Sequence, residues 1–519
     1  MITPTNFVAP LCLTVVALFG AWAIFMYFRF SRSQGGQHVD TEFFLTARNS
    51  QPWQRVAWGL FGSSLGAGVV FSISAFALYG GGIIGLAVYA ISTGLPLVLV
   101  AHMGSTIKQR LSRPMSIASF ARWRFGRAMQ IYISLNVLFN LGVAMCVEYT
   151  AIGSLFSSFL GTPSWVPIVV VGTVTLVYTI AGGLYVSILT DQVQAIFTWM
   201  LLAVTGIYLC AFYRPGPMPA IPEGLGVTDM GWQSILTLGV AVTGGIVFSD
   251  AVWQRVWAAK DDRALKTGAY VASTMCILVA ASFGLGGYFA AVYGLVDLGD
   301  PAQVNAAFFS IFKPNGPMSE VPISMLTVVC LLAATMNQSA IDSFQNAILD
   351  TILSVFLSFG FNISVNFARI VLIVINAPLM YVGVQGFNIV NLFLMTNTLT
   401  TSSLIPFILG LFSHLDWLLS GMSVLFGSLA GIFSVMVLGF LNYGSWSAGI
   451  YAYFYTTYAW QPFLLALITS TVATFIFAFA EFGIRSVMGN PLRPPAYFEK
   501  AESNSRSDTE VDLNRDAFE

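Results

Sequence analysis

The sequence predicts an all-α membrane protein whose chain crosses the bilayer many times. Hydrophobic residues make up 56% of the 519 residues and charged residues only 9%, whereas soluble domains carry about 25% charge. A chain this apolar cannot cover a surface that faces water, which excludes a soluble enzyme. Apolar runs of about twenty residues recur along the chain, as helices that cross a bilayer require. A membrane barrel would show short alternating strands instead.

The apolar runs divide into thirteen predicted membrane spans. In chain order the spans are 6–29, 54–80, 83–107, 129–160, 164–182, 188–212, 232–256, 268–293, 321–354, 364–383, 386–412, 417–441 and 460–484. The first span has no small-residue cleavage site, and Arg29 and Arg32 follow its apolar stretch. This pattern favours an uncleaved membrane anchor over a signal peptide.

The basic residues predict how the chain is oriented. With the N-terminus outside, 20 of the 22 Lys and Arg residues lie in or beside cytoplasmic loops, as the positive-inside rule requires. The densest basic group runs from Lys108 to Arg127. We therefore expect an integral multi-pass protein of the plasma membrane, with its N-terminus outside and its C-terminus in the cytoplasm. The acidic, polar stretch 485–519 is typical of a disordered tail.

Two of the predicted spans contain clusters of small residues. Span 54–80 carries Gly62, Gly66 and Gly68, and span 232–256 carries Gly244 and Gly245 after a threonine. Glycine inside a helix costs ~1 kcal/mol relative to alanine, so each cluster marks a place where a helix can unwind. The two spans lie five spans apart and run in opposite directions. Paired interruptions of this kind indicate a transporter binding site, although either cluster alone would also suit close helix packing.

Acidic residues occur inside several predicted spans. A charge in the middle of a bilayer costs ~3 kcal/mol or more, so each acid needs a partner, water or a function. Glu148 is the deepest acid, and it is either a proton site or a hydrogen-bonding partner of a neighbouring helix. Asp342 is the second candidate for a proton site. Asp250 lies five residues before Arg255, which makes an ion pair between them plausible.

Polar side chains near the two weak points predict a cavity and a cation site. A cavity lined by Ser72, Ser74, Ser249 and Asp250 would suit a neutral or cationic small polar solute. Span 321–354 carries a further polar stripe that runs from Thr335 to Ser343. Hydroxyl and carbonyl oxygens are ligands that suit an alkali cation. The alternative is a stripe of hydrogen bonds between helices.

Two motifs resemble those of a known family. The stretch from Tyr178 to Gln194 resembles the YTxxGGLxAxxxTDxxQ signature of the sodium:solute symporter family. The stretch 247–259 is similar to that family's DQxxxQRxxAA segment, and its WQR form resembles the urea and polyamine branch. The run from Gly80 to Gly126, with its basic loop, is similar to the same branch.

The resemblance implies a LeuT-like fold of two inverted five-helix repeats, in which core helices 1 and 6 are discontinuous. The expected parts are an extra N-terminal transmembrane helix at 1–30, a cytoplasmic loop at 31–53, the first repeat at 54–212, the second repeat at 213–412, two C-terminal transmembrane helices at 413–484 and a cytoplasmic tail at 485–519.

The resemblance also implies where a sodium ion would bind. The family's site lies between carbonyls of core helix 1, which fall here on Ala67 and Val70, and two adjacent hydroxyls of core helix 8. Two registers are open for the second helix, and each leaves one hydroxyl, either Thr335 or Ser339. Asp191 matches the family acid that influences cation coupling or lines the inward exit. Because one hydroxyl is missing in either register, both sodium and proton coupling remain open.

The expected function is a symporter that imports a small polar solute together with sodium or protons. Urea is the first expectation for the solute, followed by polyamines and amino acids, and a passive facilitator is the alternative. The three histidines are scattered, and no Ser-His-Asp or HExxH arrangement occurs, so we expect no enzyme activity. We expect no cofactor, no metal besides the candidate sodium and, from the net charge of −1, no nucleic-acid partner.

Overall fold

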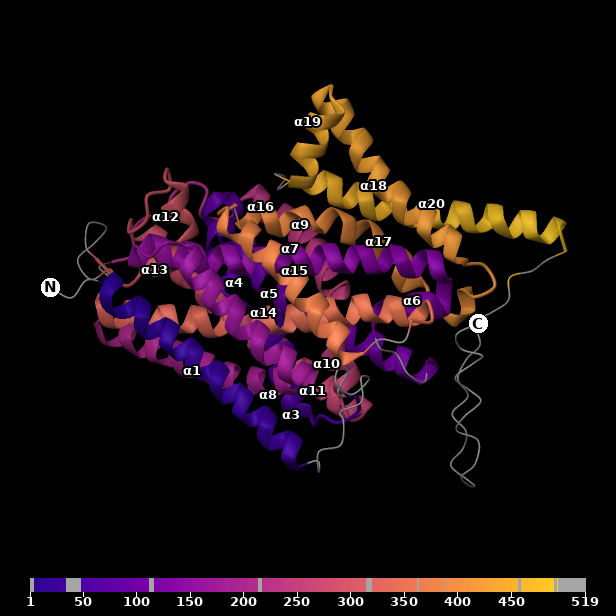
Figure 1. Cartoon of the computed structure of the whole chain (residues 1–519). Coiled ribbons are helices and arrows are strands. Elements are labelled where there is room, and N and C mark those ends of the chain that lie inside the picture. The colour runs from indigo at the N-terminus through magenta and orange to yellow at the C-terminus, as the bar shows by residue number, and fades with distance from the viewer. Residues whose placement is uncertain are drawn as a thin grey trace.

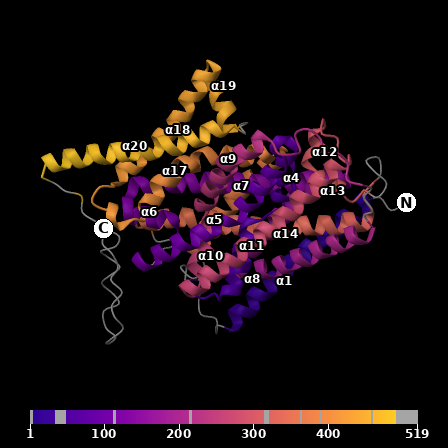
Figure 2. The same cartoon turned by 180° about the vertical axis from the view of Figure 1, so that it is seen from behind.

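The computed structural model describes residues 4–33, 48–111, 116–212, 217–313, 320–361, 364–387, 389–455, 459–489 and 492. The regular elements of these residues are helices, and the described chain otherwise contains one isolated bridge between Gln51 and Ala259. Most of the long helices run lengthwise side by side in one bundle (Figures 1 and 2). The predicted tail 485–519 lies almost entirely outside the described residues.

Ten segments of the described chain are long and apolar enough to cross a membrane. The difference from the thirteen predicted spans comes from broken or short helices. Helices of spans 54–80 and 83–107 merge into one segment, Gly68–Arg110, and a shorter apolar helix, Arg369–Val384, overlaps span 364–383. Span 386–412 consists of two short helices. The prediction of an all-helical polytopic membrane protein is confirmed.

The first half of the chain begins with α1 (Pro4–Ser33), which precedes the predicted repeats. The remaining elements of this half are α3 (Trp53–Ser64), α4 (Gly68–Phe76), the π-helical turn η1 (Ala77–Gly81), α5 (Gly82–Arg110), α6 (Ile117–Phe125), α7 (Arg127–Leu160) and α8 (Trp165–Phe212). Gly183 has a φ of +58°, a left-handed value that glycine tolerates. It divides α8 into the two spans expected from the sequence.

The second half of the chain contains the remaining helices. Its elements are α9 (Asp229–Val247), α10 (Asp250–Ala258), α11 (Asp262–Val292), α12 (Pro301–Asn305), α13 (Ala307–Ser310), α14 (Ile323–Ser358), α15 (Val365–Val384), α16 (Ile389–Met395), α17 (Asn397–Leu409), η2 (Ser413–Leu415), α18 (Gly421–Tyr443), α19 (Trp446–Ile450), η3 (Tyr451–Tyr455) and α20 (Trp460–Val487). The exact repeat boundaries remain a prediction.

Two interruptions of the helices define the centre of the bundle. Residues 65–67 are not helical and separate α3 from α4, within the first predicted weak point. The second interruption, at Phe248 and Ser249, falls later than the expected Gly244–Gly245. Those glycines remain helical. Gly244 allows a close approach between helices, since an added Cβ would lie 2.9 Å from the Thr400 hydroxyl of α17.

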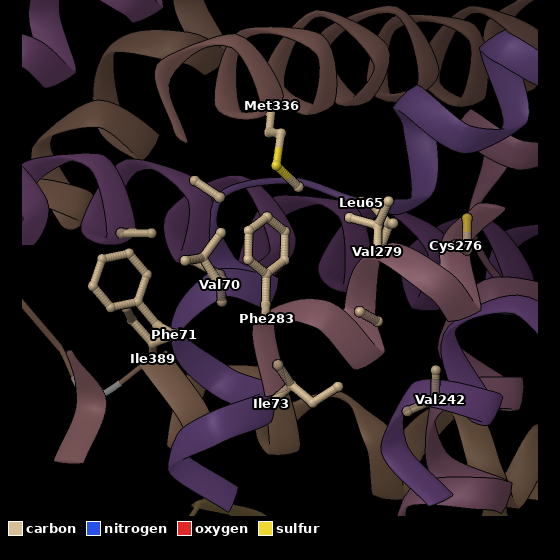
Figure 3. Packing of buried hydrophobic residues seen from close by; sticks show 14 of the residues in the cluster. Leu65, Val70, Phe71, Ile73, Val242, Cys276, Val279, Phe283, Met336 and Ile389 are labelled. Carbon is tan, nitrogen blue, oxygen red and sulfur yellow. The ribbon is translucent and has the colours of Figure 1, made fainter. Parts of the chain in front are cut away.

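The hydrophobic core surrounds the first interruption. α14 packs against α7 and α8, and α11 packs against α3 and α5. Between these helices, Leu65 and Val70 from the interrupted segment pack in one cluster with Phe283 of α11 and Met336 of α14 (Figure 3). α1 packs against α8 and α14, while α18, α19 and α20 extend from one side of the bundle (Figure 1). The interrupted backbone therefore lies in protein and not in lipid, as an unwound membrane segment requires.

Candidate functional site

A cavity of about 140 Å³ lies where the two interruptions meet. It is lined by Gly66 and Gly68 at the first interruption, by Ser249 at the second, and by Glu148 of α7. The other polar side chains of its wall are Ser63, Ser64, Ser72, Tyr89, Thr93, Asn140, Thr396 and Asn397. A central cavity between two broken helices is the usual place for substrate in transporters built from inverted repeats.

Glu148 hydrogen-bonds to the backbone at the first interruption. Its Oε1 accepts the backbone N–H of Gly68 at 3.2 Å, and its Oε2 accepts Nδ2 of Asn337 at 2.9 Å. Gly66 leaves no room for a side chain, because an added Cβ would collide with the Glu148 carboxylate. The first N–H groups of a helix have no partner within the helix and carry partial positive charge. Glu148 therefore places a carboxylate at the positive end of α4.

Asn140 of α7 hydrogen-bonds to the backbone at the second interruption. Its Nδ2 donates to the carbonyl oxygens of Gly245 at 2.9 Å and of Phe248 at 3.2 Å, which the helix end leaves exposed. Its Oδ1 accepts the Thr396 hydroxyl at 3.1 Å. Nearby, Nδ2 of Asn397 is buried and has no hydrogen-bond partner within the described residues. Sequence reasoning missed both asparagines, although the amides inside the apolar span 129–160 were the signal that could have found Asn140.

Two of the four predicted cavity residues line the cavity. Ser72, whose hydroxyl accepts from Tyr89 at 2.9 Å, and Ser249 form part of its wall. Ser74 instead donates weakly, at 3.4 Å, to carbonyls of its own helix. Asp250 is fully buried elsewhere. It accepts the backbone N–H of Ile117 at 3.0 Å and the Thr351 hydroxyl at 2.5 Å, and so joins α10 to α6 and α14.

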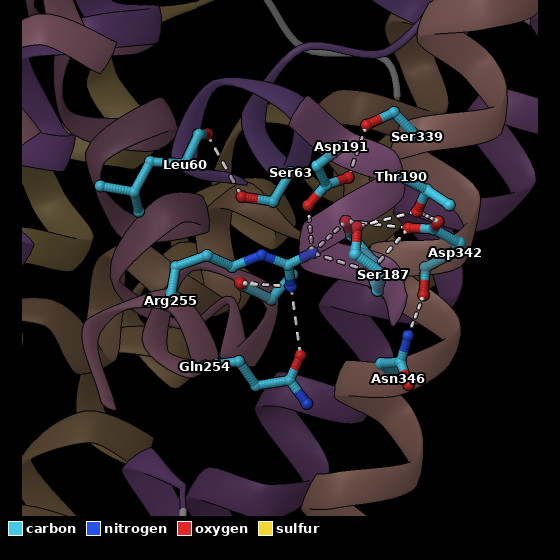
Figure 4. A network of polar contacts seen from close by, with 12 residues as sticks. Leu60, Ser63, Ser187, Thr190, Asp191, Gln254, Arg255, Ser339, Asp342 and Asn346 are labelled. Atoms are coloured by element: carbon cyan, nitrogen blue, oxygen red, sulfur yellow. Dashed lines mark hydrogen bonds and ion pairs between the residues drawn. The ribbon is translucent and has the colours of Figure 1, made fainter. Parts of the chain in front are cut away.

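Arg255 forms a buried ion pair with Asp191 (Figure 4). Its Nη2 lies 2.7 Å from Oδ2 of Asp191, and both side chains are at most 1% exposed. The same nitrogen donates to the hydroxyls of Ser187 at 3.1 Å and Ser343 at 2.7 Å. The expected pair between Asp250 and Arg255 is wrong. Packing directs Nη2 of Arg255 toward α8 and α14, and its Nη1 donates to the Ala251 carbonyl of its own helix at 3.1 Å.

Asp342 lies in the same network and is held by hydroxyl groups. Its carboxylate accepts Tyr178 at 2.7 Å, Ser187 at 2.9 Å and Thr190 at 3.1 Å. Tyr178 lies before the kink in α8, and Ser187 and Thr190 lie after it. Ser187 also contacts Arg255. The network thus contains two buried carboxylates and one guanidinium (Figure 4).

The predicted cation ligands are distributed over two places. Ser339 donates to Oδ1 of Asp191 at 2.8 Å, and this pair lies beside the end of α3: a Cβ on Gly62 would be 2.5 Å from the Ser339 oxygen. Ala67 and Val70 are buried at the first interruption. Val70 belongs to the same hydrophobic cluster as Met336 of α14 (Figure 3).

Thr335 is placed elsewhere. It borders a separate cavity formed with α1 and α8, and its hydroxyl donates to the Leu331 carbonyl at 2.7 Å. The sequence left two candidate hydroxyls open, Thr335 and Ser339. Of these, Ser339 lies beside the end of α3.

Comparison with solved structures identifies the fold. A Na⁺-coupled sialic acid symporter superposes with a TM-score of 0.68 over 90% of this chain and 97% of that chain, at 17% identity. A nucleobase-cation-symport-1 family transporter in a closed conformation superposes with a TM-score of 0.51 over 86% of this chain and 96% of that chain, at 15% identity. The fold is that of the LeuT-like transporters.

Sequence comparison then gives the family. The profile of the sodium:solute symporter family matches residues 43–357, and the chain belongs to this family. The spermidine transporter DUR31 of Candida albicans is 26% identical over 451 residues, which cover 85% of this chain and 83% of that protein. Solute carrier family 5 member 4 of Rattus norvegicus is 30% identical over 217 residues, 40% of this chain and 29% of its own length. Family and fold together support a cation-coupled symporter.

Proposed function

We propose that this symporter imports a small organic amine, with polyamines as the leading substrate class. The observation that carries the proposal is the carboxylate of Glu148 in the wall of the central cavity. Among the described residues of this wall, it is the single charged side chain. A carboxylate in a water-poor site interacts favourably with an ammonium group and unfavourably with an anion.

The position of Glu148 strengthens the preference for a cation. In transporters of this general design, the positive end of a broken helix commonly attracts the anionic group of a substrate. Here Glu148 already occupies that end of α4 through Gly68. An anionic solute would therefore meet a like charge where it would otherwise find N–H groups. The similarity to a spermidine transporter over 85% of the chain agrees with this preference.

Uptake by purified protein in proteoliposomes tests the proposal. We expect labelled spermidine or putrescine to accumulate above its outside concentration, and Glu148→Gln to lower that uptake by tenfold or more. Glu481→Gln is the matched control, because Glu481 lies in α20 and contacts Ser420 and Arg485 outside the cavity. Wild-type spermidine uptake by the Glu148→Gln protein would contradict the proposal.

Urea is the second candidate, and Asn397 favours it. The unpartnered Nδ2 of Asn397 needs a hydrogen-bond acceptor, and a fully protonated polyamine offers none, whereas the urea carbonyl does. The amino groups of urea can in turn donate to Glu148. Urea uptake that Asn397→Leu lowers, in a protein that does not accumulate spermidine, would select urea.

We further propose that the coupling cation binds between the first interruption and α14. The ligands would be the carbonyls of Ala67 and Val70, the Ser339 hydroxyl and Asp191. The support is the charge balance: with both carboxylates ionised, Asp191, Asp342 and Arg255 together carry one excess negative charge. A buried uncompensated charge is unfavourable, and a sodium ion would offset it. A proton on Asp342 or Glu148 is the alternative.

A further inference from the structure

A second cavity, of about 320 Å³, lies between α1, α8 and α14. Its wall consists of Val15, Val16, Leu18 and Phe19 of α1, Val193, Gln194 and Phe197 of α8, and Leu331, Ala334, Thr335 and Gln338 of α14. α1, which lies outside the predicted repeats, supplies one apolar side of it.

The polar groups of this second cavity are on the α8 and α14 sides. Gln338 is 2% exposed, and its Nε2 has no hydrogen-bond partner among the residues that the structure describes. Gln194 is 1% exposed, its Nε2 side faces the Tyr178 hydroxyl, and its Oε1 has no hydrogen-bond partner in the described chain. Buried polar groups are nearly always hydrogen-bonded in proteins, and leaving one unpaired costs about 1–3 kcal/mol. The two amides therefore indicate an occupant that both accepts and donates a hydrogen bond.

The mouth of the second cavity faces the lipid. Leu18 is 64% exposed and Val193 is 37% exposed, and both belong to segments apolar enough to cross a membrane. An occupant would therefore enter from the bilayer and not from water. The apolar wall around the two amides requires that most of this occupant be hydrocarbon.

We propose that the second cavity binds a membrane alcohol of the sterol class, with a hydrocarbon body and one hydroxyl group. The hydroxyl would accept from Nε2 of Gln338 and donate to Oε1 of Gln194, while the hydrocarbon packs against α1. A diacylglycerol fits less well, because its ester carbonyls would be buried in the apolar part of the wall without donors. This site is independent of the solute and coupling ion proposed above.

Saturable binding of radiolabelled cholesterol to the full-length protein in phosphatidylcholine nanodiscs tests the proposal. We expect Gln338→Leu to weaken binding by about 3- to 10-fold, which is the worth of one neutral hydrogen bond. Ala334→Phe fills the cavity and should abolish saturable binding. Val204→Phe is the matched control, because Val204 is 46% exposed on α8 and is not part of the cavity wall. Melting temperatures confirm that each variant is folded.

Two competitors identify the recognised group. Unlabelled cholesterol should displace the label, whereas cholesteryl methyl ether, which cannot donate a hydrogen bond, and dioleoylglycerol should compete at least threefold less well. Absence of saturable binding to the wild type would overturn the proposal. Equal affinity in the Ala334→Phe protein, or equal competition by dioleoylglycerol, would also overturn it.

Discussion

A buried arginine is held by one carboxylate in this protein, and a second carboxylate lies nearby. Arg255 is 1% exposed and pairs with Asp191, and Ser187 links it to Asp342. The interior of a membrane protein penalises an unpaired charge strongly. The protonation or cation occupancy of this network is therefore coupled to its hydrogen bonding, which is the property that a cation-driven transporter needs.

Replacing Asp191 by asparagine should uncouple the cation while the protein still reaches the membrane. The change leaves the Arg255 guanidinium with hydroxyl and amide partners only, and breaking a buried ion pair typically costs about 3–5 kcal/mol. We expect lower thermal stability and a several-fold rise in the sodium concentration for half-maximal uptake, or a shifted pH optimum. Unchanged cation dependence in the Asp191→Asn protein would remove this residue from coupling.

The two candidate hydroxyls of α14 should differ in their effect. Ser339 donates to Asp191 at 2.8 Å beside the end of α3, whereas Thr335 donates to its own helix and borders the second cavity. We therefore expect Ser339→Ala to abolish stimulation of uptake by sodium and Thr335→Ala to retain most of it. Sodium titrations of initial uptake rates measure the difference, and the reverse order would assign the cation to the Thr335 register.

The glycines around the helix interruptions have different tolerances for a side chain. A Cβ on Gly66 would collide with the Glu148 carboxylate, but on Gly245 its nearest neighbour would be Oδ1 of Asn397, at 3.7 Å. We expect Gly66→Ala to lower uptake by more than tenfold and Gly245→Ala to fold and transport. Uptake divided by the amount of folded protein, from fluorescence-detected size exclusion, checks both. Normal transport by Gly66→Ala would mean that Glu148 can leave α4 freely.

The second interruption depends on a side chain from another helix. Asn140 satisfies two carbonyls, those of Gly245 and Phe248, between α9 and α10. Asn140→Leu should cost about 1–3 kcal/mol per carbonyl left unpaired and should reduce uptake, whereas Asn140→Asp should fail to restore it because a carboxylate donates no N–H. Thermal melting and uptake are the measurements. Full activity of Asn140→Leu would show that water replaces the amide.

The bundle as a whole should perform concentrative transport. Because family and fold support a cation-coupled symporter, uptake should rise above equilibrium when sodium is outside. Replacing sodium by choline at fixed pH should remove the accumulation. Accumulation that survives in choline but disappears with the pH gradient would assign coupling to a proton. Uptake that stops at equal concentrations under every gradient would identify a passive facilitator.

The sequence by itself determined the membrane class, the family and the approximate helices of this protein. A bilayer requires long apolar helices. Each span meets this requirement through its own run of apolar residues, as α7 does, so the helices can be predicted without knowledge of their neighbours. The signature from Tyr178 to Gln194 lies within the profile match at 43–357. The first interruption was also predictable, because the glycines of span 54–80 lower helix stability wherever they lie.

Only the tertiary structure decided which polar groups meet. Arg255 pairs with Asp191, 64 residues away in the chain, and not with Asp250 on its own helix. Asn140 and Asn397 join the cavity, while Ser74 and Asp250 turn away from it. These outcomes depend on how each helix is rotated about its axis and on which neighbour it packs against. Helical spacing shows which residues share a face, but the partner of that face is set by packing between segments far apart in the chain.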